Sequence, residues 1–220
     1  MVEIKDGIVC KEEYDSSVIK MLWVLKEGNV AEKDETKSRD ICEEIRTGWH
    51  IRNALRIPTF RKMIYATYGI FFPEEEWSNV PFANEDSAYN VLKQIAYINI
   101  NKMPGASKAN YNNIKKAYEK YEKELLTQIG EYNPNIIVFG GTLHFFNTKE
   151  LAKIGWNIID TKKSYFDESK IGTTTSFFKI SKDKLIINAY HPSYPGIKDK
   201  QYWLEIKSVA ENWKKHFLYM

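Results

Sequence analysis

A histidine that could act in catalysis stands at position 191, at the start of a His-Pro-Ser run. It follows the apolar segment 185–189 by one residue, and the next residue, Pro192, restricts its backbone. An imidazole directed in this way can donate a hydrogen bond to a leaving group that gains negative charge. The alternative is a turn histidine that bonds only backbone atoms.

An acidic residue, Glu27, stands just after another apolar segment, residues 20–25. A carboxylate there can orient a water molecule, or stabilise positive charge on a sugar while a glycosidic bond breaks. Lys26 and Asn29 flank Glu27 and could replace it in either role. A solvated surface glutamate is the alternative interpretation.

Two asparagines, Asn99 and Asn101, lie two residues apart at the end of the apolar segment 95–100. In a strand, this spacing points both side chains to the same side. An amide offers an acceptor oxygen and two donor hydrogens, which match the Watson–Crick edge of a pyrimidine. Two residues that only cap the strand end are the alternative.

Two glycine-containing segments could approach a phosphate closely. Residues 103–107 (Met-Pro-Gly-Ala-Ser) form a predicted rigid turn, and residues 140–142 (Gly-Gly-Thr) precede a predicted helix. Neither segment matches a nucleotide-binding fingerprint, so the sequence indicates no nucleotide cofactor.

The candidate residues follow four continuously apolar segments, a pattern typical of parallel strands buried on both faces. These segments are residues 20–25, 95–100, 135–139 and 184–189. Helical patterns occupy residues 84–92, 111–129 and 202–217, and Gly130 is expected to end the second of them. We therefore predict an α/β fold of three layers, α/β/α, around a central, mostly parallel four-stranded sheet. Ligands of such sheets bind at the carboxyl ends of the strands, so the candidate residues should share one crevice.

A mainly helical insertion is expected after the first strand, over residues 30–85. Within it, residues 38–47 and 59–68 have helical patterns. Residues 156–160 and 173–180 are rich in β-forming residues and could add strands at an edge of the sheet.

The composition is that of a single globular domain, residues 1–220, with 43% hydrophobic and 28% charged residues. Its two cysteines are too few for a disulfide scaffold or a four-cysteine metal site. The sequence contains neither a membrane-spanning segment nor a signal peptide, so we expect a cytoplasmic protein with no membrane partner. The net charge of +3 and the pI near 8.6 are compatible with a polyanionic partner.

Taken together, these motifs resemble those of the uracil-DNA glycosylase superfamily. The resemblance is carried by residues 22–29 (Leu-Trp-Val-Leu-Lys-Glu-Gly-Asn), 97–101 (Tyr-Ile-Asn-Ile-Asn), 133–140 (Asn-Pro-Asn-Ile-Ile-Val-Phe-Gly) and 188–196 (Asn-Ala-Tyr-His-Pro-Ser-Tyr-Pro-Gly). That superfamily has an acidic residue or Asn in its first motif, an Asn at the end of its second strand and a late His-Pro-Ser motif. Glu27 stands where its best-known branch has a water-activating Asp.

The resemblance implies a DNA glycosylase that flips its target nucleotide out of the base stack into the crevice. His191 would stabilise the departing base. Glu27, with Asn29 as its substitute, would support the sugar cation and orient water. The base would be bound by amides and one stacking aromatic ring, drawn from Asn99, Asn101, Trp49, Phe60, Phe71 and Phe72.

The resemblance also implies contacts to the DNA backbone and a wedge that fills the emptied base stack. The residues implied are Ser193, Tyr194, Pro195, Pro104, Ser107 and Lys26. The partner would be single- or double-stranded DNA, the protein a monomer, and no metal or cofactor would be required. The substrate would be uracil or a modified or hypermodified pyrimidine, in DNA repair or in defence against viral DNA.

Two other functions remain open at this point. The chain could be a catalytically inactive module of the same fold that binds nucleic acid or a protein, or a hydrolase of small nucleosides or nucleotides. DNA affinity without base release would favour the first, and activity on free nucleosides would favour the second.

Overall fold

The computed structural model describes residues 4–29, 39–48, 53–105, 109–158 and 175–217. Its main sheet has six strands in the order β2-β5-β3-β6-β8-β7. Their bounds are β2 (Gly7–Ile8), β5 (Ile95–Gly105), β3 (Met21–Asn29), β6 (Ile136–Gly140), β8 (Lys184–Ala189) and β7 (Ser176–Ser181). A separate parallel pair joins β1 (Ile4–Lys5) to β4 (Arg39–Asp40).

The four predicted strands are the four central, mutually parallel strands β5, β3, β6 and β8. The expected total of four strands is wrong, because an antiparallel strand is added at each edge, β2 beside β5 and β7 beside β8. β7 lies in the second of the two β-rich segments. The described part of the first, residues 156–158, contains no strand. β2 is only two residues long, which is too short for a pattern to be recognised in the sequence.

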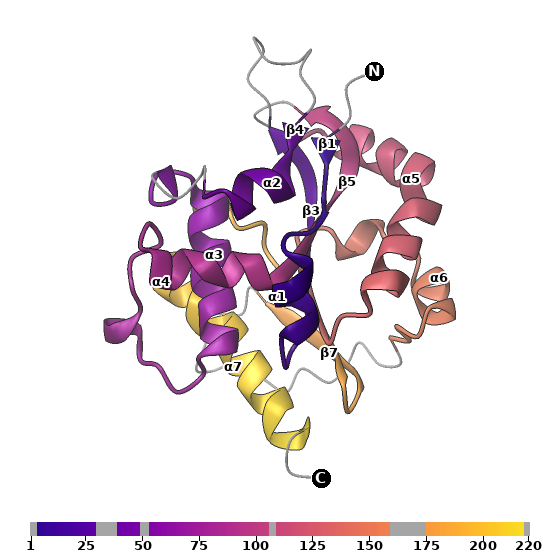
Figure 1. The fold of residues 1–220 in the computed structure, drawn as a ribbon. Helices are drawn as coiled ribbons and strands as arrows, with labels where there is room; N and C mark the ends of the chain where they lie inside the picture. Colours follow the sequence, from indigo (N-terminus) through magenta and orange to yellow (C-terminus); the bar gives the residue numbers. More distant parts are fainter. Residues whose placement is uncertain (1–3, 30–38, 49–52, 106–108, 159–174, 218–220) are drawn as a thin grey trace.

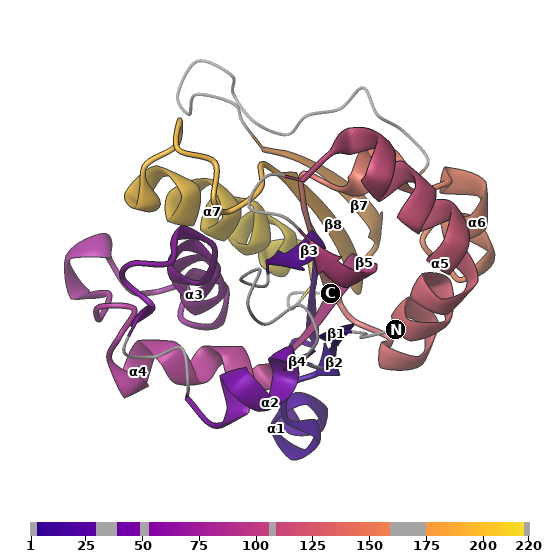
Figure 2. The same cartoon turned by 90° about the horizontal axis from the view of Figure 1, so that it is seen from above.

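Helices cover both faces of the sheet, as predicted (Figures 1 and 2). One face carries α5 (Tyr111–Tyr132) and α6 (Thr148–Lys153), and α1 (Lys11–Ser16) lies at the β2 edge of the sheet with Tyr14 in the cluster beneath α5. The other carries α2 (Ile41–Arg46), α3 (Pro58–Phe71), α4 (Asp86–Tyr89) and α7 (Asp199–Phe217). Short 3-10 turns occupy Trp77–Asn79, Asn90–Gln94 and Leu143–Phe145.

The central strands are mostly apolar because side chains from each of them are buried on both faces. Along β3, Leu22 and Val24 pack towards α5, whereas Trp23 and Leu25 pack towards α3 and α7. Successive side chains of a strand point to opposite faces, so both helical layers require apolar partners. Trp23 also donates from Nε1 to the Thr67 hydroxyl on α3, at 3.1 Å.

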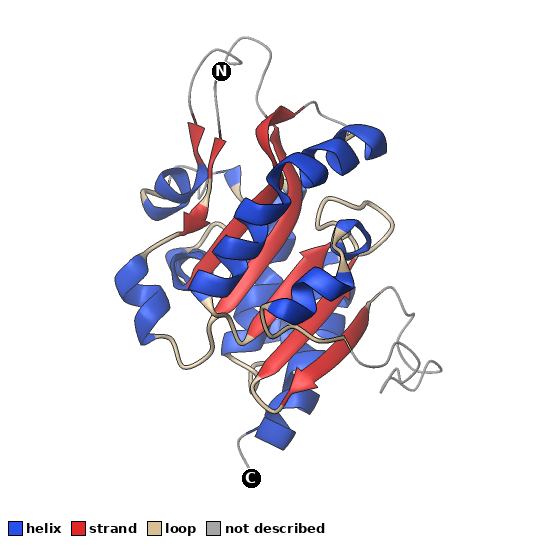
Figure 3. Ribbon diagram, turned by 90° about the vertical axis from the view of Figure 1, so that its right-hand side faces the viewer, coloured by secondary structure: helices blue, strands red, loops and turns tan. Residues whose placement is uncertain are grey.

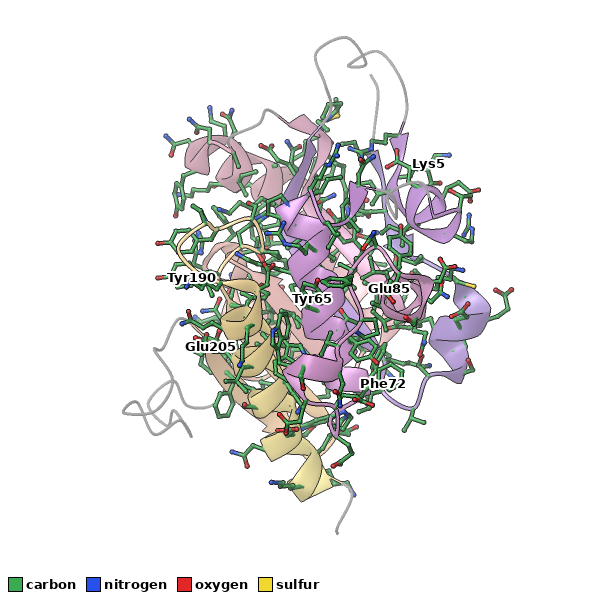
Figure 4. All side chains as sticks on the ribbon, turned by 90° about the vertical axis from the view of Figure 1, so that its left-hand side faces the viewer. Lys5, Tyr65, Phe72, Glu85, Tyr190 and Glu205 are labelled. Carbon is green, nitrogen blue, oxygen red and sulfur yellow. The ribbon has the colours of Figure 1, made fainter. Side chains whose placement is uncertain are left out.

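The predicted insertion is an integral part of one layer. Its helix α3 packs against the sheet and against α7 with most of its residues buried, and Figure 4 shows α3 and α7 side by side. The other expected helix, over 38–47, is the shorter α2, which begins after Asp40 because that side chain accepts a hydrogen bond from the Glu43 N–H.

Two helix boundaries differ from the prediction. Gly130 lies inside α5, and the helix continues to Tyr132, after which Asn133 adopts the left-handed conformation with a φ of 43°. Asparagine tolerates this conformation, so Asn133 ends the helix in place of the glycine. The pattern predicted over 84–92 is the single turn α4 followed by a 3-10 turn.

The two longest strands, which run behind α5 in Figure 3, are β3 and β5, and both extend beyond the ends predicted for them. β3 continues through residues 26–29 and β5 through residues 101–105, two segments that we expected to be loops. They pair with each other, Glu27 with Asn101 and Asn29 with Gly105, across an irregular register. This mutual pairing satisfies backbone groups of polar segments that had no strand pattern of their own.

Candidate active site

A cavity of about 680 Å³ lies at the carboxyl end of β3, near the point where the chain reverses its direction across the sheet. β3 has β5 on one side and β6 on the other, so the crossovers on its two sides run in opposite directions. Such switch points are the usual binding crevices of open α/β sheets. The cavity is lined by the end of β3, the start of α3 and the His191 loop, including Lys26, Glu27, Phe60, Tyr97, His191, Ser193, Tyr194 and Pro195.

His191 is held in one orientation by the residue two positions after it. The Ser193 N–H donates to His191 Nδ1 at 3.2 Å, and the Ser193 hydroxyl lies 2.8 Å from the same nitrogen. Since Nδ1 accepts this backbone hydrogen, the neutral ring carries its own proton on Nε2. His191 can therefore present an Nε2–H donor to a ligand in the cavity.

The charge state of His191 is set by its surroundings. Burial, and then the nearby Lys26 and Lys62 ammonium groups, lowers the pKa of His191 to about 4. The imidazole is consequently neutral at physiological pH. A neutral donor can stabilise negative charge that develops on an oxygen without first transferring its proton.

Two glycines let the end of β6 approach the His191 loop closely. A Cβ on Gly140 would lie 2.4 Å from Leu25 Cδ2, and one on Gly141 would lie 3.3 Å from the His191 nitrogen. Gly141 also has a φ of 68°, and its N–H donates to the Ala189 carbonyl at 2.7 Å. The Gly-Gly pair thus brings the strand ends together around the site. From the sequence, it was one of two segments that could hold a phosphate.

Glu27 is positioned by the neighbouring strand. Asn101 Nδ2 donates to Glu27 Oε2 at 3.0 Å, and Asn101 Oδ1 accepts from the Met103 N–H at 3.1 Å. The Glu27 side chain lies directly over Gly105, where a Cβ would come within 2.2 Å of Glu27 Cδ. The Asn101 amide therefore holds the carboxylate in place, and the absence of a side chain at Gly105 leaves room for it.

The two predicted base-reading amides have different surroundings. Asn99 is fully buried and does not line the cavity, and its Oδ1 accepts from the Tyr97 hydroxyl at 3.1 Å. Tyr97 lines the cavity in its place. Asn101, on the same side of β5 but nearer the strand end, is only partly buried and contacts Glu27.

The predicted stacking residues of α3 lie at opposite ends of the helix. Phe60, at the start of the helix, lines the cavity. Phe71, expected as an alternative stacking residue, lies at the other end of the helix and does not line it. Figure 4 shows the neighbouring Phe72 at that far end, beyond Tyr65. Trp49 lies outside the described residues.

Of the residues expected to contact the DNA backbone or act as a wedge, Lys26, Ser193, Tyr194 and Pro195 line the cavity. Pro104 lies within β5, so the rigid turn expected at 103–107 is a strand end in its described part. Ser107 lies outside the described residues. Asn29, expected to substitute for Glu27, pairs through its backbone with Gly105.

Comparison with known proteins finds no matching family model and no matching curated protein. The described residues hold no group of three or more His, Cys, Asp or Glu side chains that could bind a metal ion. Within the same part of the chain, no helix is both long and apolar enough to cross a membrane.

Lys62 is the main residue at this site that sequence reasoning missed. It is only 3% exposed, its Nζ donates to the Tyr194 carbonyl at 2.6 Å, and it lies 5.8 Å from the centre of the Tyr202 ring. Burial lowers the pKa of this amine, an effect that Asp199 opposes. The sequence signal that could have found it is a lysine among mostly apolar residues of a helix. A lysine at such a position is expected to be buried, and a buried lysine requires a polar partner.

Proposed function

We propose that this protein hydrolyses the N-glycosidic bond of a damaged or modified base in DNA and leaves an abasic site. The observation that carries the proposal is that a neutral imidazole, His191, and a positioned carboxylate, Glu27, line one cavity. Its volume of about 680 Å³ is in the range that holds a small ligand, and a flipped-out nucleoside is of that size.

In the proposed reaction, the two groups act at opposite ends of the breaking bond. The bonding electrons leave with the base, and His191 Nε2–H donates a hydrogen bond to a carbonyl oxygen of the base on which the negative charge collects. Glu27 stabilises the positive charge on the sugar and orients the attacking water. The water oxygen bonds to the sugar carbon, and one proton of the water neutralises the released base.

The remaining lining residues fit a nucleotide ligand. Phe60 and Tyr97 supply aromatic residues to the lining, where a base would bind, and Lys26 supplies an ammonium group for a phosphate. The substrate class that we propose is a pyrimidine, either uracil or a modified pyrimidine. Release of uracil would assign the protein to repair, and release of a hypermodified base would assign it to defence against viral DNA.

The test is base release from DNA oligonucleotides that carry uracil, mismatched thymine, hypoxanthine or glucosylated cytosine, scored as strand cleavage by alkali at the abasic site. We expect His191→Ala to slow release by about 100- to 1,000-fold, because one donor to a developing anion is lost. Phe82→Ala is the matched control, since Phe82 is 66% exposed and does not line the cavity.

Three outcomes would contradict the proposal. Release that is unchanged in His191→Ala would mean that this residue does not act at the departing base. Cleavage of free nucleosides with no release from any of the oligonucleotides would instead indicate a small-molecule hydrolase. DNA binding without release from any of the four substrates would indicate an inactive binding module.

A further inference from the structure

Three aromatic side chains gather at the surface, where the first residue of α5 meets the 3-10 turn that follows β6. The rings of Tyr111 and His144 are nearly parallel, with an interplanar angle of 5° and centroids 5.7 Å apart. Phe145 lies against both, 5.0 Å from Tyr111 and 4.1 Å from His144. We call these three residues the aromatic platform.

The platform is open to solvent. Tyr111 is 57% exposed and His144 is exposed, whereas Phe145 is partly buried against the apolar cluster beneath α5. Single exposed aromatic residues are common, but a contiguous exposed group of them marks an interaction site. Helix α5 does not need Tyr111 for its first turn, because Asn110 caps that turn by accepting from two backbone N–H groups.

The position of the platform relates it to the cavity. Ala109, which lines the cavity, precedes Tyr111 by two residues, and Gly141, where an added Cβ would lie 3.3 Å from the His191 nitrogen, precedes His144 by three. The platform lies on the face covered by α5 and α6, which Figure 2 shows across the sheet from α3 and α7.

A second exposed aromatic pair lies on the opposite face. Tyr190 and Tyr194 are stacked with centroids 4.8 Å apart, are 45% and 44% exposed, and contact residues of α7 and α3. Figure 4 shows Tyr190 beside α7. His191 lies between these two tyrosines in the chain, and Tyr194 itself lines the cavity.

A positive charge lies at the cavity, on the β3 residue Lys26. Lys26 alternates with Leu25 and Glu27 along β3, so its side chain projects towards the α5 face, and it also lines the cavity. After burial, the Lys26 ammonium is the next cause that lowers the pKa of both His144 and His191. Aromatic rings beside an ammonium group match the bases and phosphates of a nucleic acid strand.

We propose that Tyr111, His144 and Phe145 form a stacking site for an unpaired base of the DNA strand whose neighbouring nucleotide occupies the cavity. This inference rests on the proposed function and extends it, because it specifies a substrate that is single-stranded or locally unpaired next to the target. The strand crosses the carboxyl edge of the sheet, with one phosphate near Lys26 and one base against the platform.

Binding of a single-stranded oligothymidylate of about 10 nucleotides tests the inference, since that length covers a typical single-strand site. We expect the double substitution Tyr111→Ala/His144→Ala to weaken binding about tenfold, as is usual for the loss of one base stack. The dependence of affinity on salt should stay unchanged, because no phosphate contact is removed. Tyr111→Phe/His144→Phe, which keeps the rings, should bind as the wild type does, and so should Phe82→Ala.

A second measurement replaces each nucleotide of the probe in turn by an abasic analogue. In the wild type, one such replacement should reproduce the loss seen in the double variant. In the double variant, the same replacement should cause no further loss, because the two partners of one interaction are not independent. Equal sensitivity of both proteins at every position would overturn the inference, as would normal binding by the double variant.

These binding measurements do not depend on base release, so either proposal can fail without the other. If a base is released while the double variant binds normally, the platform is disproved and the enzymatic proposal stands. If no base is released but the double variant binds weakly, the enzymatic proposal fails and the platform remains a stacking site of a DNA-binding protein. Tighter binding of an oligouridylate would assign the platform to RNA and overturn the DNA assignment.

Discussion

Lys62 and Tyr194 are joined by a hydrogen bond from the lysine Nζ to the tyrosine carbonyl, 2.6 Å long and spanning 132 residues of sequence. The Tyr202 hydroxyl on α7 donates in the same way to the Tyr190 carbonyl, at 2.9 Å. The segment that carries His191 is therefore held by two hydrogen bonds. The one from α7 reaches the residue before His191, and the one from α3 reaches a residue after it. Lys62 is a positioning residue in this arrangement, and its charge also acts on His191.

Lys62→Met should shift the acid limit of activity to higher pH. Burial, Lys26 and Lys62 lower the pKa of His191 to about 4, so removal of the Lys62 charge should let this pKa rise towards its usual value. The neutral form is the active one, and activity is lost as pH falls through the pKa of the folded protein. The acid limb of base release should thus lie near pH 4 in the wild type and higher in the variant.

An NMR titration of the His191 ring checks the same shift without any enzymatic assay. Lys62→Arg is the control, because it keeps the charge and should leave the acid limb in place. A His191 pKa that is the same in Lys62→Met and in the wild type would show that the lysine acts on the loop only through its hydrogen bond.

Glu27→Gln should slow base release by about 100-fold, because the neutral amide can neither stabilise a sugar cation nor take a proton from water. Asn101→Leu should slow release less, since it leaves the carboxylate in place but removes the 3.0 Å hydrogen bond that orients it. Single-turnover rates on the best oligonucleotide substrate would measure both effects.

Asn112→Ala is a suitable control for the asparagine variant, because Asn112 is exposed on α5 and does not line the cavity. Full activity in Asn101→Leu would mean that Glu27 needs no partner on β5. Full activity in Glu27→Gln would remove the carboxylate from the mechanism.

Gly105→Ala should reduce activity without a comparable loss of stability. The added Cβ would lie 2.2 Å from Glu27 Cδ, so the carboxylate must move away and lose its bond to Asn101. Gly130→Ala is the matched control: no atom lies within 4 Å of its added Cβ. Because Gly130 is exposed inside α5, this alanine should raise the free energy of unfolding by about 0.5–1 kcal/mol.

Base-release rates and thermal unfolding of the two glycine variants separate the two effects. A Gly105→Ala protein with wild-type rates would show that Glu27 can move aside without consequence. Loss of activity in Gly130→Ala would show that the assay responds to changes remote from the cavity.

Much of the architecture follows from the sequence alone. The four central strands are predictable because a strand buried on both faces must be apolar at every position, and such runs are visible in a linear sequence. The location of His191 and Glu27 at strand ends follows from the same runs, since the carboxyl ends of parallel strands meet at one edge. The edge strand β2 and the extended ends of β3 and β5 depend on pairing partners far away in the chain, so their own residues show no strand pattern.

Only the tertiary structure decided which side chains face the cavity. The spacing of Asn99 and Asn101 places both on one side of β5, but the Tyr97 hydroxyl engages Asn99 in the buried layer while Asn101 reaches Glu27. Lys62 meets the His191 loop only because α3 and α7 pack together on the same face. Local periodicity specifies the face of an element, whereas the depth of a side chain and its partner are set by the packing of elements distant in sequence.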